Sequence, residues 1–311
     1  MAAVLSRNRQ PLLRKSARES LQMSKIFSKR KLAGVLAATA LLGAMAMTPV
    51  QASGEAPHIE RLDWTFGGLT GHFDKEQLRR GYLVYKNICA SCHGLRQVYF
   101  RNLSEPGGPE FSEASVAQFA SEANVQDGPN DDGEMFDRPG RPADRFPSPY
   151  PNEKAAAAAQ GGAVPPDLSL MAKARAVAGA GPWYLEPFHW AYDILTMYQE
   201  GGSDYLHALM TGYEEPPEGV EVLPGMHYNA AFPGHQIAMP APLSEGLVDY
   251  ADGTPPTVEN YARDVTAFLT WTAEPKLEER KQMGLKVLIY LAVLTLLLFL
   301  SKRALWRNVE H

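Results

Sequence analysis

The segment NICASCHGL, residues 87–95, contains both cysteines of the chain, Cys89 and Cys92, and places His93 directly after the second of them. Thiol and imidazole groups act as redox groups, metal ligands and points of covalent attachment. A dithiol redox centre is expected where a strand leads into a helix, with one thiol of low pKa. A structural zinc site needs four ligands, often supplied by two separated pairs.

The third possibility is covalent attachment of haem, for which Cys-x-x-Cys-His is the signature. Residues at positions i and i+3 of a helical turn face the same side, so two thiols can reach two vinyl groups on one edge of the macrocycle and form thioethers. His93 then lies beside the iron as the proximal ligand. The pair closes an amphipathic helix and no further cysteine is present. The sequence therefore favours one covalently bound haem c over the other two sites.

The second axial ligand decides the chemistry of the iron, because a methionine favours electron transfer and raises the potential. Met239 is the candidate, since it lies in the proline-braced segment HQIAMPAPL. Met226, in PGMHYN, and His235 are alternatives, and His235 would give a haem of lower potential. An open sixth position would instead favour ligand chemistry such as that of a peroxidase.

The elements that must position these groups are three predicted helices, at residues 73–89, 257–272 and around 203–211. Asp74 is a suitable N-cap for the first, and Pro255 and Pro256 precede the second. The first helix places four residues on one face: Leu78, Tyr82, Tyr85 and Cys89. The second does the same with six: Val258, Tyr261, Val265, Phe268, Leu269 and Thr272.

We expect the first and last helices to cross, with Gly81 and Tyr85 meeting Phe268 and Leu269. Gly81 lowers helix propensity but permits close approach of another backbone. Residues 127–151 are rich in Gly, Pro and Asp, and this composition predicts an irregular stretch. A large prosthetic group makes such a stretch acceptable, because loops can pack on it.

Two apolar runs, one near each end of the chain, predict export and membrane anchoring. Residues 32–47 follow a basic segment and precede a small-x-small site, as in a secretory signal peptide cleaved after Ala52; a retained anchor is the alternative. Residues 283–301 are long enough to span a bilayer. We therefore expect an N-terminal extension and signal peptide at 1–52 and a periplasmic domain at 53–275. A juxtamembrane linker at 276–282, the transmembrane helix at 283–301 and a cytoplasmic tail at 302–311 follow.

The exported part, residues 53–275, is strongly acidic. It contains 31 Asp and Glu residues against 14 Lys and Arg residues, a formal net charge of −17. Such a field argues against nucleic acid as a partner and favours basic proteins. Solvated surface charge alone is the alternative explanation.

Six segments together resemble the cytochrome c1 family, the haem subunits of the cytochrome bc1 complex. They are RRGYLVYKNICASCHGL, VQDGPNDDGEMFDRPG, PYPNEKAAAAAQGGAVPPDLS, DYLHALMTGYEEPP, YNAAFPGHQIAMPAPL and DVTAFLTWTAEP, followed by the single anchor. The resemblance covers nearly the whole exported chain. Its middle segments are more specific than the haem-attachment motif, which many c-type cytochromes share.

The resemblance implies an all-α class I c-type cytochrome domain with long irregular loops around the haem, plus one C-terminal transmembrane helix. It makes Cys89 and Cys92 the thioether residues and His93 and Met239 the axial pair. It also places the family's propionate-binding arginine at Arg175. Between residues 176 and 202 the chain departs from the mitochondrial relatives, which have only a few residues there.

The resemblance also implies the partners and the location. Electrons would pass from a Rieske iron–sulfur protein to this haem and then to a soluble basic cytochrome c, with cytochrome b as the neighbouring subunit. The subunit would perform no catalytic chemistry of its own. It would lie in the bacterial inner membrane with its haem domain in the periplasm. A membrane-anchored subunit of another oxidoreductase, such as a terminal oxidase, is the alternative.

Overall fold

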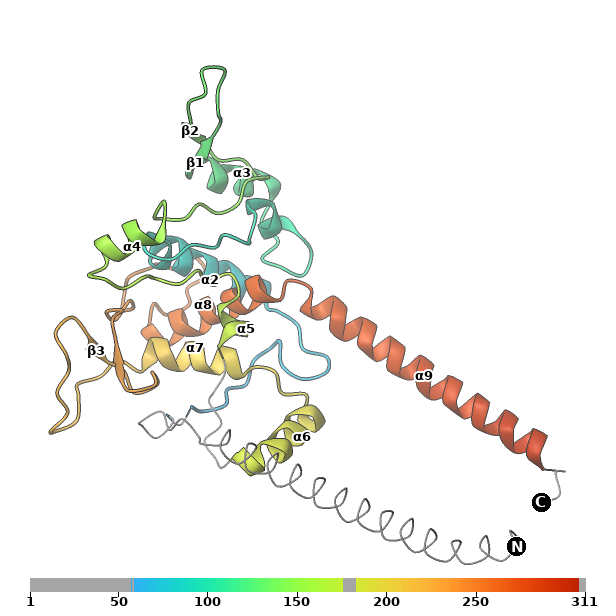
Figure 1. Cartoon of the computed structure of the whole chain (residues 1–311). Coiled ribbons are helices and arrows are strands. Elements are labelled where there is room, and N and C mark those ends of the chain that lie inside the picture. Colours follow the sequence, from blue (N-terminus) through green and yellow to red (C-terminus); the bar gives the residue numbers. More distant parts are fainter. Residues whose placement is uncertain (1–56, 58, 176–182, 308–311) are drawn as a thin grey trace, which may run out of the picture. The chain divides into compact units, whose positions relative to one another are not determined.

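The computed structural model describes residues 57, 59–175 and 183–307, and this part of the chain is mostly helical (Figure 1). The predicted signal peptide lies outside the described residues. The α-helices are α2 (Lys75–Asn87), α3 (Glu113–Ser121), α4 (Glu153–Ala159), α5 (Met171–Ala174), α6 (Glu186–Thr196), α7 (Gly201–Thr211), α8 (Val258–Ala273) and α9 (Leu277–Trp306). Four short strands form two antiparallel hairpins, β1 (Asn124–Asp127) with β2 (Phe136–Pro139) and β3 (His227–Tyr228) with β4 (Gln236–Ile237).

Helix α2 begins where the sequence predicts. The Asp74 carboxylate caps it by accepting hydrogen bonds from the backbone N–H groups of Glu76 and Gln77, at 2.9 and 3.3 Å. These bonds satisfy two of the donors that a helix start leaves unpaired. The predicted apolar face is confirmed, since Leu78, Tyr82, Tyr85 and Cys89 are all buried.

Helix α8 is the centre of the core. Thr257 caps it by accepting a hydrogen bond from Asn260 N at 3.3 Å. The helix is buried on nearly every side, and Tyr261, Phe268 and Leu269 are at most 1% exposed. Helix α7, predicted around residues 203–211, also packs on α8, and the Ser203 and Thr270 hydroxyls hydrogen-bond at 2.8 Å between them. All three predicted helices are therefore confirmed.

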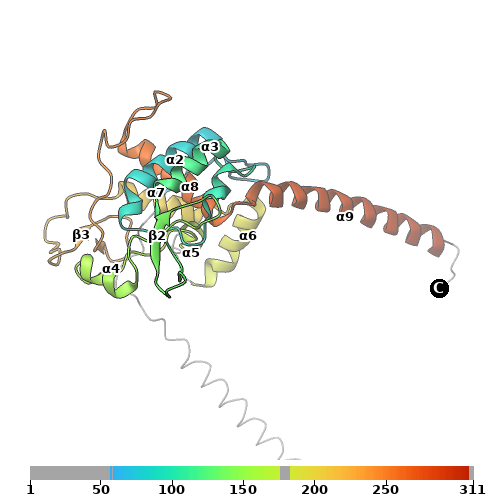
Figure 2. The ribbon, with the colours of Figure 1, turned by 90° about the horizontal axis from the view of Figure 1, so that it is seen from above.

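Helices α2 and α8 lie against each other, as both views show (Figures 1 and 2). Gly81 is at the closest approach, where an added Cβ would lie 2.1 Å from Asp264 O and 2.7 Å from Phe268 Cβ. The Tyr85 and Phe268 rings pack with centroids 5.9 Å apart. The predicted crossing of the first and last helices of the domain is confirmed, and its closeness depends on glycine.

We predict that Gly81→Ala destabilises the domain. The methyl group gains about 1 kcal/mol of helix propensity, but it forces α2 away from α8, and overpacking of this kind costs about 1–3 kcal/mol or more. We expect a net loss of about 2 kcal/mol in a denaturant titration followed by circular dichroism. Gly201→Ala in the first turn of α7 is the matched control, because its Cβ would meet nothing closer than 3.5 Å. Equal stability of the two variants would contradict the prediction.

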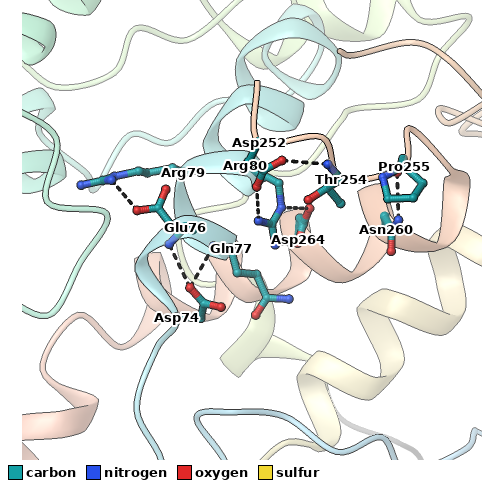
Figure 3. Close-up of polar contacts among 10 residues, drawn as sticks. All are labelled: Asp74, Glu76, Gln77, Arg79, Arg80, Asp252, Thr254, Pro255, Asn260 and Asp264. Atoms are coloured by element: carbon teal, nitrogen blue, oxygen red, sulfur yellow. Dashed lines mark hydrogen bonds and ion pairs between the residues drawn. The ribbon is translucent and has the colours of Figure 1, made fainter. Parts of the chain in front are cut away.

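An ion pair between α2 and α8 stabilises the same crossing, and no local sequence pattern predicts this pair. Arg80 on α2 donates from Nε to Asp264 Oδ2 at 2.8 Å and from Nη2 to Asp264 Oδ1 at 3.2 Å (Figure 3). Its third bond goes to Asp252 Oδ2 at 2.7 Å. Burial raises the pKa of Asp264 in spite of the guanidinium. Removing one partner of such a pair leaves a largely buried charge unpaired, so we expect loss of either residue to destabilise the crossing.

The expectation that residues 127–151 are irregular is wrong in part. Strand β2 lies within them and pairs with β1, Val125 opposite Arg138. Arg138 stabilises the hairpin with ion pairs to Asp127 at 2.5 Å and to Asp144 at 2.6 Å. Local composition shows neither which residues of such a segment pair as strands nor which side chains form ion pairs. Helices α3, α4, α5 and α6, of 9, 7, 4 and 11 residues, were likewise not predicted.

Helix α9 is the one helix among the described residues that is long and apolar enough to cross a membrane. It begins at Leu277, so residues 277–282 of the expected linker are helical. Its first turns contact the domain: Glu278 Oε1 accepts from Phe73 N at 2.7 Å, and Lys281 Nζ donates to Phe66 O at 2.5 Å. From Val287 to Leu300 every residue is exposed in the isolated chain, as expected of a lipid-facing helix.

Candidate functional site

The candidate site begins where α2 ends. The backbone continues from α2 into a single 3-10 turn, η1 (Cys89–Ser91). Cys89 O accepts hydrogen bonds from Cys92 N at 3.1 Å and from His93 N at 2.8 Å. One carbonyl therefore closes the turn that brings Cys89, Cys92 and His93 together, as the motif spacing predicts.

The His93 side chain has a fixed orientation. Its Nδ1 lies 2.8 Å from Pro166 O, and Tyr85 OH donates to its backbone carbonyl at 3.0 Å. A carbonyl partner holds Nδ1 in the protonated form and leaves Nε2 as the free ligand atom. Burial lowers the pKa of His93, which favours the neutral imidazole that binds metal ions.

The backbone contact at Pro166 is part of a strap formed by residues 165–169, the PPDLS segment. Asp167 Oδ2 accepts from Arg96 N at 2.8 Å, and Ser169 Oγ accepts from Gln97 N at 3.1 Å. Leu168 N donates to Gly94 O at 2.9 Å. The strap therefore binds the chain directly after His93 and holds the imidazole partner in place.

The two thiols lack the features of a redox pair. Cys89 and Cys92 are unbridged, and burial raises the pKa of Cys89 to about 12. A dithiol redox centre needs an accessible thiol of depressed pKa, so this reading is disfavoured. A zinc site is disfavoured too, because the described residues contain no cluster of three or more His, Cys, Asp and Glu side chains able to hold a metal ion.

Met239 follows the β3–β4 hairpin and packs, half-buried, against the hydrophobic core. Its carbonyl accepts a hydrogen bond from Tyr213 OH at 3.1 Å, which ties this segment to the end of α7. Met226, one alternative, lies in the turn that precedes β3. His235, the other, stacks on Tyr228 with ring centroids 5.7 Å apart and has a positive φ of 57°. Met239 is therefore the candidate axial ligand that packs against the hydrophobic core.

Arg175 lies at the end of α5 with its side chain exposed. Its backbone packs on α7, where a Cβ at Gly202 would lie 2.6 Å from Arg175 O. Among the described side chains the guanidinium forms no ion pair, so its charge is available to an anionic group. Its electrostatic influence reaches Tyr205 of α7.

This donor set fits a covalently attached haem. Two thiols on one turn, an imidazole with Nδ1 occupied by a carbonyl, and a thioether on a core-packed segment are the groups that such a cofactor requires. The motif identified Cys89, Cys92 and His93. The contacts that Pro166, Asp167 and Ser169 make with residues 93–97 were not predicted, because contacts between residues about 70 positions apart leave no local signal.

The chain is similar to known proteins over most of its length. The model of the Cytochrome C1 family matches residues 64–309. The chain is 46% identical to the cytochrome c1 of Blastochloris viridis over 269 residues, 86% of this chain and 93% of that protein. It is 42% identical to a mitochondrial cytochrome c1 heme protein of Solanum tuberosum, over 85% and 92% of the two chains. It is also 53% identical to the cytochrome b/c1 of Bradyrhizobium diazoefficiens over 79% of this chain, which spans about a third (35%) of that longer protein.

The family match extends from the beginning of the described domain, through the haem-attachment motif and the strap, to the end of α9. The chain belongs to the cytochrome c1 family.

Proposed function

We propose that this chain is the electron-transfer subunit of a quinol–cytochrome c reductase, the cytochrome bc1 complex, and connects a Rieske iron–sulfur protein to a soluble cytochrome c. Family membership carries the proposal, together with the haem-attachment turn held by the strap. As a member of the cytochrome c1 family the chain carries a covalently bound haem c. When bound, that group supplies a reversible one-electron change of its iron.

The protein's own residues bind and orient the cofactor. Cys89 and Cys92 would form the thioethers, and His93 and Met239 would ligate the iron. Rigid ligation of this kind leaves little to rearrange when an electron arrives or departs. The proposed role is electron transfer, which includes no bond-making chemistry of the subunit's own.

Arg175 would hold a haem propionate, because a guanidinium fork matches a carboxylate. We predict that Arg175→Gln lowers the haem potential, since a nearby positive charge disfavours the oxidised iron. Lys173→Gln is the matched control, since Lys173 lies on the same short helix but pairs with Glu274 at 2.6 Å. A redox titration of the haem in the two variants tests the assignment of Arg175 to a propionate. An unchanged potential in Arg175→Gln would contradict it.

Cytochrome b is the proposed neighbour in the membrane. The Bradyrhizobium relative named cytochrome b/c1 is a longer protein of which this chain matches about a third. None of the relatives compared above supports a terminal oxidase, the alternative partner. Purification of the tagged chain from mild detergent should bring cytochrome b and an iron–sulfur protein with it. Recovery with oxidase subunits would support the alternative.

The acidic domain would attract a basic carrier. Asp131, Asp132 and Glu134 are exposed in the β1–β2 loop, and a second exposed cluster follows α7, at Glu214, Glu215 and Glu218. Complementary fields of this kind accelerate encounter more than they tighten binding. The location that fits this partner is the periplasmic face of the bacterial inner membrane, with α9 as the single span.

We predict that electron transfer to a basic soluble cytochrome c slows steeply with salt. The Debye length falls to about 8 Å at 0.15 M ionic strength, so attraction between separated charges is screened. The measurement is the second-order rate across a salt series. Neutralising Glu214, Glu215 and Glu218 together should flatten the slope, whereas the same change at Asp131, Asp132 and Glu134 serves as the charge-matched comparison. A rate that does not depend on ionic strength would show that the acidic residues do not attract the carrier and serve only solubility.

A further inference from the structure

Helix α6 (Glu186–Thr196) has no part in the proposed electron path. Its apolar side chains are exposed to an unusual degree: Phe188 71%, Ile194 72% and Leu195 83%. Trp190 and Tyr192 on the same helix, and Tyr184 just before it, are also exposed. A soluble domain seldom presents so many large apolar groups together unless something covers them.

The polarity of α6 is the reverse of that of an ordinary surface helix, which turns its apolar face to the core. Here the side that carries Asp193 faces the domain, where Arg61 Nη2 donates to Asp193 Oδ1 at 2.9 Å. Asp193 is half-buried, while the apolar side chains on either side of it along the helix point into solvent. The ion pair therefore marks Asp193 as lying on the side of α6 that faces the domain.

The end of α6 is fastened to the base of α9. Met197 ends α6 in the left-handed conformation, and the next residue, Tyr198, hydrogen-bonds through its hydroxyl to buried Asp204. Gln199 Oε1 then accepts from Arg280 Nη2 at 3.1 Å, in the first turn of α9. Gln199 and Glu200 also line one small cavity together with Leu277 and Lys281.

The contacts between the end of α6 and α9 indicate which partner covers the apolar surface of α6. Arg280 lies about two helical turns before Val287, where the continuous apolar run of α9 begins. An apolar helix held beside the point where a span enters the bilayer is at the level of the lipid headgroups. Trp and Tyr side chains are enriched at this level, and amphipathic helices lie in it with the apolar face in the acyl boundary.

We propose that α6 is an interfacial helix, which buries Phe188, Trp190, Ile194 and Leu195 in the periplasmic leaflet beside α9. The inference rests on the proposal that α9 spans the membrane. The helix is a second membrane contact that orients the acidic domain on the bilayer surface. We propose that lipid covers the apolar surface of α6. Coverage by another protein chain is the alternative that the test distinguishes.

Photocrosslinking in native membranes tests this contact. A benzophenone amino acid replaces Phe188 or Leu195 in the full chain, and a haem stain on denaturing gels confirms that each variant is assembled. Leu223, 63% exposed in the loop before β3, is the water-facing control. Leu297 in the apolar run of α9 is the lipid-facing control. We expect phospholipid adducts at positions 188, 195 and 297 in comparable yield, and at least tenfold fewer at 223.

The inference would be wrong if the adducts at 188 and 195 formed with another polypeptide or with another part of this chain. It would also be wrong if lipid adducts at these positions were no more abundant than at 223. The control in α9 separates this failure from failure of the anchor itself. Lipid adducts at 297 without adducts at 195 would reject the interfacial helix alone, whereas their absence at 297 would reject the membrane span on which it rests.

Discussion

The double variant Cys89→Ala/Cys92→Ala is expected to leave almost no assembled protein. Both thioethers are lost, and the cofactor would then be held by axial ligation alone. Between the end of α7 and the start of α8, residues 212–257 contain only two two-residue strands among regular elements. Long irregular stretches are uncommon in compact domains without a partner to pack on, and their ordering entropy is about 1–2 kcal/mol per residue.

The measurement is a haem stain of denatured membranes beside an immunoblot for the chain. We expect the covalent haem signal to vanish and the protein level to fall at least tenfold. Ser91→Ala is the matched control within the same turn, because Ser91 is exposed and its hydroxyl bonds only Ile88 O and, weakly, Cys92 Sγ. Stable, folded, haem-free protein from the double variant would show that the fold does not depend on the cofactor.

Met239→Leu is expected to change the haem without removing it. Leucine keeps the volume and the core packing of the side chain but has no sulfur. Axial ligands set haem potentials over a range of about 0.8 V, and loss of the thioether should lower the potential. The weak sulfur-to-iron absorption band near the red end of the spectrum should disappear.

The comparison variant is Met226→Leu, which removes the rival sulfur and should keep both the band and the potential. Replacing His235 with Asn tests the remaining alternative in the same way. If Met239→Leu retained the band and the potential while Met226→Leu lost them, the axial assignment would move to Met226.

The helices that build the domain were predictable because their signals are local. The periodic apolar faces of α2 and α8, the Asp74 cap and the single glycine at position 81 all follow from short windows of sequence. The same holds for Cys89, Cys92 and His93, which one helical turn brings together. Local regularity thus accounts for the helix crossing and for the attachment turn.

The features that sequence reasoning missed are set by pairs far apart in the chain. The Arg80–Asp264 ion pair joins residues 184 positions apart, and the bond between His93 and Pro166 joins residues 73 apart. The β1–β2 hairpin was missed for a related reason, since a composition typical of loops conceals the cross-strand pairing that Arg138 stabilises. The exposure of the apolar face of α6 could not be predicted, because periodicity shows that a helix face is apolar but not what covers it.

Electrons from quinol are expected to pass through this chain. Rapid mixing of the purified complex with a quinol, followed by oxidised soluble cytochrome c, tests it directly through the absorbance of the haem bound to this chain. We expect this haem to be reduced by the quinol and reoxidised by the carrier, each at least as fast as steady-state turnover. A haem that stays oxidised while the soluble cytochrome c is reduced at the normal rate would contradict it.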